Sequence, residues 1–201
     1  MLRVDLLRHG EPEGGQRYRG WLDDPLTPAG WEAMGRVWRR LAGEVEHIVS
    51  SPLRRCAEPA RAWAAERGLP LTVDRRVAEL RYGAWEGLTA EAIRERDGEL
   101  LERWRRDPRG LRPPGGESPE ELWERVGAWW RETVARFPTG RLLVVTHSGV
   151  LRTLLAQVLG GDLAASRRFR VPYACWARLC VVEGGHVQLE AFGAEPGGDL
   201  A

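Results

Sequence analysis

Short aliphatic runs alternate with long amphipathic stretches along this chain, and the alternation limits what it can fold into. The runs at 2–7 and 142–145 have the length and composition of buried strands. The stretch 28–45 instead carries apolar residues at spacings of three and four, the period of a helix. Strands that alternate with helices are typical of α/β domains. We therefore predict a three-layer α/β sandwich in which helices flank a mostly parallel central sheet.

Residues that favour helix starts place three of the predicted helices. Thr27 precedes a proline, a good N-cap followed by a good first helical position. Ser51 repeats this pattern, and Ser118 adds Glu121 three residues later to form a capping box. Pro59 lies inside the second of these helices, so we predict a kink there or a shorter helix.

The same patterns place the remaining elements. They predict strands at 45–49, 71–73, 177–182 and 186–192, the last two as a hairpin, and helices at 89–107 and 150–159. The segment 109–116 carries three Gly and two Pro and is predicted to be a loop that serves as a lid or as a substrate-facing insertion. We predict one domain over 1–201, with a disordered tail at 194–201.

Charge and composition exclude several functional classes. The chain has 201 residues with 30 basic and 29 acidic side chains, a balance that argues against nucleic-acid or anionic-membrane partners. All 30 basic residues are Arg, so chemistry that needs a Lys, such as a Schiff base or a phosphate-binding loop, is excluded. The sequence has no apolar run approaching the roughly 20 residues of a membrane span, and residues 1–8 lack the longer apolar core and the cleavage site expected of a signal peptide. A cytoplasmic protein is expected.

The cysteines indicate neither a disulfide framework nor a metal centre. Cys56, Cys175 and Cys180 are odd in number and lack the paired spacing of metal ligands. We interpret them as small core or surface thiols, and we predict no metal site.

Two of the four histidines occupy the same place in the predicted pattern. His9 and His147 each follow an aliphatic run directly and precede a glycine-containing turn. Ligands in open α/β sheets bind beyond the carboxyl ends of the strands, so these side chains are expected to converge there. His47 and His186 lack this setting and are assigned to structure.

Arginines and acids near these histidines favour the transfer of a phosphoryl group. Arg8 stands beside the first histidine, and Arg55 follows the end of a predicted strand. Their guanidinium forks can hold phosphoryl oxygens while a neutral imidazole attacks phosphorus in line. A leaving alkoxide also needs a proton donor. The residues alone leave Glu11, Glu79 and Glu86 equally eligible for that task.

Six sequence blocks follow one another in the order of a known enzyme family. They are Arg8-His9-Gly10-Glu11, Pro25-Leu26-Thr27-Pro28-Ala29-Gly30, Ser50-Ser51-Pro52-Leu53-Arg54-Arg55, Glu79-Leu80-Arg81-Tyr82-Gly83-Ala84-Trp85-Glu86-Gly87, Pro114-Gly115-Gly116-Glu117-Ser118 and Val145-Thr146-His147-Ser148-Gly149. Together they resemble the histidine phosphatase superfamily, which has the phosphoglycerate-mutase-like fold. A lone Arg-His-Gly is a weak signal, whereas six ordered blocks span about residues 3 to 192.

The resemblance implies a task for each residue singled out. His9 is the expected nucleophile, which becomes phosphorylated, and Glu79 is the expected proton donor. Arg8, Arg55 and His147 are expected to form the phosphate pocket. Water would then hydrolyse the phosphohistidine with Glu79 as base, so neither a metal nor another cofactor is expected.

Departures from the family pattern narrow the choice of member. The chain is shorter than the cofactor-dependent mutases and lacks the Lys residues of their extra insertion, which favours a phosphatase. The family's usual Thr is Pro12 here and its usual Asn is missing, while Arg17 matches an arginine on the substrate side. The blocks most resemble phosphatases that act on α-ribazole 5′-phosphate, a small phosphorylated metabolite of late cobalamin synthesis.

The predicted substrate side also includes Ser148 and Trp21. Trp21, in a loop, is expected to stack on the benzimidazole base. The alternatives are a broad-specificity small-molecule phosphatase, a cofactor-dependent phosphoglycerate mutase, and a protein that binds a phosphorylated ligand without turning it over. The complete set of expected catalytic residues argues against the last. A homodimer is a further expectation.

Overall fold

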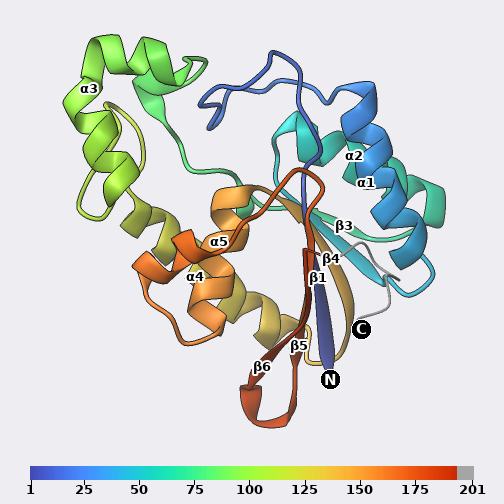
Figure 1. Ribbon diagram of the computed structural model, residues 1–201. Helices are drawn as coiled ribbons and strands as arrows, with labels where there is room; N and C mark the ends of the chain where they lie inside the picture. The colour runs from blue at the N-terminus through green and yellow to red at the C-terminus, as the bar shows by residue number, and fades with distance from the viewer. Residues whose placement is uncertain (194–201) are drawn as a thin grey trace.

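A six-stranded sheet forms the middle layer of the protein in a computed structural model that describes residues 1–193 (Figure 1). The strand order is β3-β2-β4-β1-β5-β6. The strands are β1 (Leu2–Arg8), β2 (His47–Ser50), β3 (Leu71–Val73), β4 (Gly140–Thr146), β5 (Trp176–Val181) and β6 (Val187–Phe192). The first four run parallel, whereas β5 is antiparallel to β1 and β6 to β5. The predicted mostly parallel sheet is confirmed, and the predicted tail at 194–201 lies outside the described residues.

Helices cover both faces of this sheet. They are α1 (Pro28–Leu41), α2 (Arg54–Arg67), α3 (Ala90–Arg106), α4 (Pro119–Arg136) and α5 (Ser148–Val158). The pair α1 and α2 packs on one face and the pair α4 and α5 on the other (Figure 1). Successive residues of β4 divide between the two cores, because side chains alternate along a strand: Leu143 joins the first core and Val144 the second.

The predicted caps of α1 and α4 are confirmed. The Thr27 hydroxyl accepts a hydrogen bond from the Gly30 amide at 3.0 Å. Ser118 and Glu121 form the predicted capping box, in which each side chain accepts a hydrogen bond from the other's backbone amide. These contacts satisfy amides that have no partner inside the helix.

The start of α2 differs from the prediction. This helix begins at Arg54 rather than after Ser51, and the Arg54 amide donates to the carboxylate of Asp23 at 2.6 Å. The cap therefore comes from a loop 31 residues earlier in the sequence. The helix continues through Pro59 to Arg67, so of the two predicted alternatives, a kink or a shorter helix, the second is wrong.

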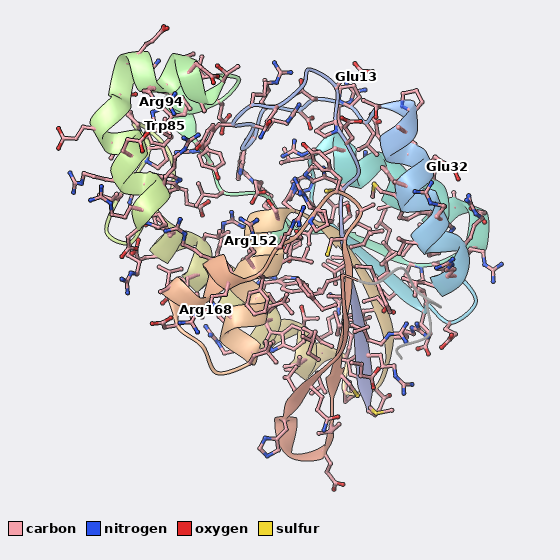
Figure 2. All side chains as sticks on the ribbon, in the orientation of Figure 1. Glu13, Glu32, Trp85, Arg94, Arg152 and Arg168 are labelled. Carbon is pink, nitrogen blue, oxygen red and sulfur yellow. The ribbon has the colours of Figure 1, made fainter. Side chains whose placement is uncertain are left out.

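The helix α3 stands away from the sheet and packs on its own small core. Trp85 is fully buried against Ile93 and Leu101, and it lies beside α3 in Figure 2. Its indole nitrogen donates to Asp97 at 2.8 Å, where the backbone of α3 is kinked. Tyr18 exchanges backbone hydrogen bonds with the segment just before α3. The loop that follows β1 is thus joined to the α3 region, beyond the carboxyl ends of the strands (Figure 1).

The segment 109–116 is a loop, as predicted, but it is attached to a neighbouring loop. The Ala84 amide donates to the Pro114 carbonyl at 2.8 Å, and the Glu117 amide donates to the Arg81 carbonyl at 2.7 Å. These bonds hold it against the segment 81–84, an arrangement that does not favour the predicted lid.

None of the helices in residues 1–193 is both long and apolar enough to cross a membrane. The three cysteines are free and buried. Residues 1–193 hold no group of three or more His, Cys, Asp or Glu side chains that could bind a metal ion.

Candidate active site

The two predicted histidines lie side by side at the carboxyl ends of adjacent strands. Because β1 and β4 pair in register from Leu2 to Arg8, the residues that follow them emerge together. The His9 amide donates to the Thr146 carbonyl at 2.9 Å. The ring centroids of His9 and His147 are 5.1 Å apart. The expected convergence of these two side chains is confirmed.

The hydrogen bonding of His9 selects one tautomer of its ring. The Nδ1 atom lies 2.8 Å from the carbonyl oxygen of Gly10, which can only accept, so Nδ1 carries the hydrogen. Burial and the charges of Arg55 and Arg8 hold the pKa of His9 well below its ordinary value. The ring is therefore neutral at pH 7, with an unprotonated Nε2, which is the form a nucleophile requires.

His147 lies deeper in the protein than His9. It is fully buried, and its Nε2 atom is 2.7 Å from the hydroxyl of Ser51 and 3.6 Å from the sulfur of Cys56. Burial, with Arg55 and His9 nearby, also holds the pKa of His147 well below its ordinary value. The side chain precedes the first residue of α5, so it sits at the positive end of a helix.

Two arginines reach the same place from different elements. Arg8, at the end of β1, donates to the Val171 carbonyl at 2.6 Å and stacks over the ring of Tyr173 at 4.2 Å. Arg55, in the first turn of α2, donates to the carbonyls of Leu22 at 2.8 Å and Gly20 at 2.7 Å. These contacts fix both guanidinium groups before any ligand arrives.

Arginine side chains concentrate around the site. Among residues 1–193, the buried side-chain nitrogen and oxygen atoms without a hydrogen-bond partner are all on arginines: Nε of Arg8, Arg17, Arg55 and Arg152, and Nη2 of Arg141. The first three of these side chains line one cavity. Three guanidinium groups in one lining give the cavity a concentration of positive charge that suits an anion.

The structure separates the three glutamates that the residues alone left equal. Glu11 is exposed, and Glu86 is occupied by the amides of Trp21 and Tyr82, each at 3.0 Å. Glu79 lines the cavity with His9. Of the three glutamates, only Glu79 is both almost completely buried and located beside the candidate nucleophile.

The N-terminus of α5 holds the Glu79 carboxylate. The Gly149 amide donates to it at 3.1 Å and the Ser148 hydroxyl at 3.3 Å. A Cβ atom on Gly149 would stand 2.3 Å from the same carboxylate oxygen, so only glycine permits this approach.

A cavity of about 680 Å³ contains most of these groups. Its lining comprises Arg8, His9, Gln16, Arg17, Tyr18, Arg19, Gly20, Arg55, Glu79, Tyr82, Thr89, Ala90, Glu91, Arg105, Ser148 and Tyr173. Arg17 and Ser148 line this cavity, whereas the fully buried His147 is not among its lining residues. Trp21 lines a second cavity of about 330 Å³ and donates from its indole nitrogen to the Glu79 carbonyl at 2.7 Å. That placement does not favour the predicted stacking on substrate.

Tyr173 is a cavity residue that the sequence analysis missed. It is 40% exposed, and its ring centroid lies 5.8 Å from that of His9. Ala174 beside it has a φ of 54°, unusual for a residue with a Cβ, and its amide donates to the His9 carbonyl at 3.1 Å. The sequence has no glycine here to signal this turn, so only the tertiary structure reveals the contact.

A family model decides the affiliation of the chain. The model of the histidine phosphatase superfamily (branch 1) matches residues 4–194. The chain belongs to the histidine phosphatase superfamily. The six blocks identified in the sequence are therefore those of a true member of this family.

Individual members of the superfamily resemble the chain over most of its length. Phosphoserine phosphatase 1 of Hydrogenobacter thermophilus is 29% identical over 193 residues, covering 94% of this chain and 92% of that protein. A probable phosphoglycerate mutase of Salmonella choleraesuis is 34% identical over 186 residues, covering 89% and 85%. The solved α-ribazole phosphatase of Shigella flexneri has a TM-score of 0.89 at 26% identity, covering 96% of each chain. The chain spans about half the length, 48%, of mycobacterial relatives that it matches at 37% identity.

The buried histidines of this superfamily member predict a loss of stability in mild acid. Both are neutral when folded but titrate near the ordinary pKa of 6.5 when unfolded, so the unfolded state binds more protons below pH 6.5. Their contribution is complete above that pH and falls by about 1.4 kcal/mol per pH unit for each histidine as the pH drops toward the folded-state pKa. Urea unfolding of wild type and His147→Gln at several pH values between 7 and 5 gives the unfolding free energy as a function of pH. This free energy should fall less steeply with decreasing pH in the variant. Equal slopes would contradict the neutral, buried assignment.

Proposed function

We propose that this protein is a phosphomonoesterase that acts through a phosphohistidine on His9. The observation that carries the proposal is the convergence, in one cavity, of a neutral imidazole, two immobilised arginines and a buried carboxyl group. These are a nucleophile, an oxyanion-binding pair and a proton carrier, which phosphoryl transfer requires.

In the first step, the Nε2 lone pair of His9 attacks phosphorus and the bond to the leaving oxygen breaks. Arg8, Arg55 and His147 stabilise the charge on the equatorial oxygens. The Glu79 carboxylic acid gives its proton to the departing alkoxide, which leaves as an alcohol. The Nδ1 hydrogen bond to Gly10 stabilises the positive charge that the phosphorylated ring acquires.

In the second step, water attacks the phosphohistidine and the nitrogen–phosphorus bond breaks. Glu79, now a carboxylate, accepts the proton from that water, which regenerates the acid for the next turnover. Inorganic phosphate leaves, and His9 returns to its neutral form. The arginines carry the positive charge throughout, so the proposed steps need no metal ion.

The proposed substrate is α-ribazole 5′-phosphate. The likeness to the α-ribazole phosphatase of Shigella flexneri over 96% of both chains supports this choice. The cavity adds support, because Tyr18, Tyr82 and Tyr173 line it and aromatic rings can contact a bulky base. A volume of about 680 Å³ leaves room for a nucleoside beside the phosphoryl group.

Phosphate release from a panel of phosphomonoesters tests this assignment. The panel contains α-ribazole 5′-phosphate, adenosylcobalamin 5′-phosphate, phosphoserine, 3-phosphoglycerate, sugar phosphates and nucleotides. We expect kcat/KM for α-ribazole 5′-phosphate to exceed the others by about 100-fold, the scale set by several well-formed contacts to a leaving group. A preference of only a few-fold would replace this assignment with a broad-specificity phosphatase.

A mutase is the second candidate, which the likeness to the Salmonella choleraesuis protein favours. The same panel separates the two functions. Isomerisation of 3-phosphoglycerate to 2-phosphoglycerate, without release of phosphate, would overturn the phosphatase proposal. Binding of the phosphomonoesters without any turnover would instead indicate a non-catalytic ligand-binding protein.

A further inference from the structure

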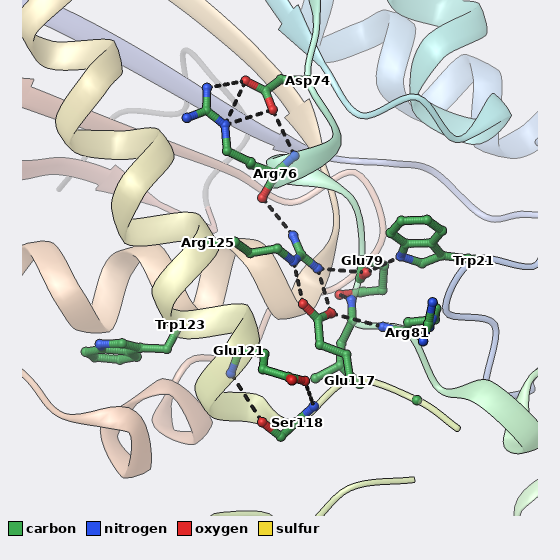
Figure 3. Close-up of polar contacts among 12 residues, drawn as sticks. Trp21, Asp74, Arg76, Glu79, Arg81, Glu117, Ser118, Glu121, Trp123 and Arg125 are labelled. Carbon is green, nitrogen blue, oxygen red and sulfur yellow. Dashed lines mark hydrogen bonds and ion pairs between the residues drawn. The ribbon is translucent and has the colours of Figure 1, made fainter. Parts of the chain in front are cut away.

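The main chain of the candidate acid residue is held from two directions. Its carbonyl accepts one hydrogen bond from the Trp21 indole at 2.7 Å and another from Nη2 of Arg125 at 3.0 Å (Figure 3). Trp21 comes from the loop after β1 and Arg125 from α4. The segment 79–82 has no helical or strand hydrogen-bond ladder of its own. Contacts from other elements must therefore determine where Glu79 lies.

Arg125 is itself tightly oriented. Its Nε and Nη2 atoms donate to the two carboxylate oxygens of Glu117 at 2.6 and 2.9 Å, and its Nη1 donates to the Arg76 carbonyl at 2.7 Å (Figure 3). The two side chains are only 18% and 15% exposed. Glu117 also accepts the Arg81 amide at 3.2 Å. The ion pair thus forms hydrogen bonds with the main chain at Arg76, Glu79 and Arg81, which lie before, at and after the candidate acid.

We propose that Arg125, oriented by Glu117 and assisted by Trp21, is a positioning residue for proton transfer by Glu79. This inference rests on the proposed function, in which that carboxyl group protonates the leaving oxygen. The far end of the Glu79 side chain is fixed by the Gly149 amide at 3.1 Å. Because Arg125 and Trp21 fix its main chain, the carboxyl group of Glu79 is held in one position relative to the phosphorus atom of a bound substrate.

A displaced acid affects substrates unequally. An error of about 1 Å in a reacting group can cost roughly 100-fold in rate. That loss applies only where the leaving oxygen needs a proton, because a stable leaving anion departs without one. A general loss of folding or phosphate binding would lower the rates for both kinds of substrate together. The ratio of the two rates is therefore specific to positioning.

The test measures kcat/KM for benzyl phosphate, whose leaving alkoxide is strongly basic, and for p-nitrophenyl phosphate, whose leaving anion is stable. In Arg125→Met we expect kcat/KM to fall about 100-fold for benzyl phosphate and no more than about threefold for p-nitrophenyl phosphate. Glu117→Gln and Trp21→Phe, which each remove part of the support, should shift the ratio in the same direction by a smaller factor. Arg131→Met, an exposed arginine on the same helix, should leave both values unchanged.

Glu79→Gln provides the reference for a lost proton donor. If it discriminates between the two substrates while Arg125→Met and Trp21→Phe lower both equally, the positioning inference is overturned and the proposed function stands. If Glu79→Gln itself shows no discrimination, the assignment of the acid in the proposed function fails. Activity on p-nitrophenyl phosphate also reports whether each variant is folded, so a variant inactive on both substrates counts against the inference.

Discussion

Replacement of His9 by alanine is expected to lower kcat/KM for every phosphomonoester by roughly 10⁴-fold or more, as loss of a nucleophile does in enzymes with covalent intermediates. The methyl side chain offers no lone pair, while the arginine donors that we propose bind the phosphoryl group remain in place. Substrate binding should therefore persist while turnover is lost. Steady-state phosphate release and a binding measurement with a slow substrate give the two quantities.

His186→Ala is the matched control for this experiment. His186 lies in the exposed turn between β5 and β6, far from the cavity in the sheet topology. Its replacement should leave kcat/KM at the wild-type value. If His9→Ala retains turnover comparable to this control, the nucleophile is another group.

Replacement of Arg55 by methionine is the second large effect that we expect. This side chain is 1% exposed and donates hydrogen bonds to the carbonyls of Gly20 and Leu22 in the loop after β1. Loss of an arginine that stabilises a transferring phosphoryl group costs about 10³-fold in kcat/KM or more. The carbonyls of Gly20 and Leu22 would also lose their donors, at a cost in stability of about 1–3 kcal/mol for each.

The neighbouring arginine gives a closely matched comparison. The Arg54 side chain is half exposed and forms a surface pair with Glu58 at 2.7 Å. Surface pairs of this kind contribute little to stability, so Arg54→Met should change both activity and unfolding free energy only slightly. Inhibition by inorganic phosphate should weaken in Arg55→Met and stay unchanged in Arg54→Met. Equal behaviour of the two variants would remove Arg55 from the phosphate site.

The position of the two histidines could be predicted because it depends on local pattern. A short aliphatic run followed by a glycine-containing turn marks the end of a buried strand, and parallel strands bring such ends to one edge. The caps at Thr27 and Ser118 are local for the same reason, since the side chain and the amide it accepts are three residues apart. These parts of the fold and the site were recoverable without coordinates.

Contacts between distant segments were not recoverable in this way. Asp23 caps a helix 31 residues later, and Trp21 and Arg125 meet the Glu79 carbonyl across 58 and 46 residues. No spacing rule links such positions, so Trp21 looked like a free loop aromatic. The position of Tyr173 depends on the left-handed backbone conformation of Ala174, which the sequence does not predict because no glycine stands there. The choice of Glu79 among three glutamates came from the family resemblance, and its physical reason is its burial in the cavity beside His9.

The most direct test of the central claim is to trap the intermediate. Wild-type protein is mixed with ³²P-labelled phosphomonoester, quenched in base during turnover, digested and mapped. We predict a base-stable, acid-labile label on the peptide that contains His9, and its loss in His9→Ala. A label on another residue, or turnover with no labelled protein at any time, would contradict the proposed mechanism.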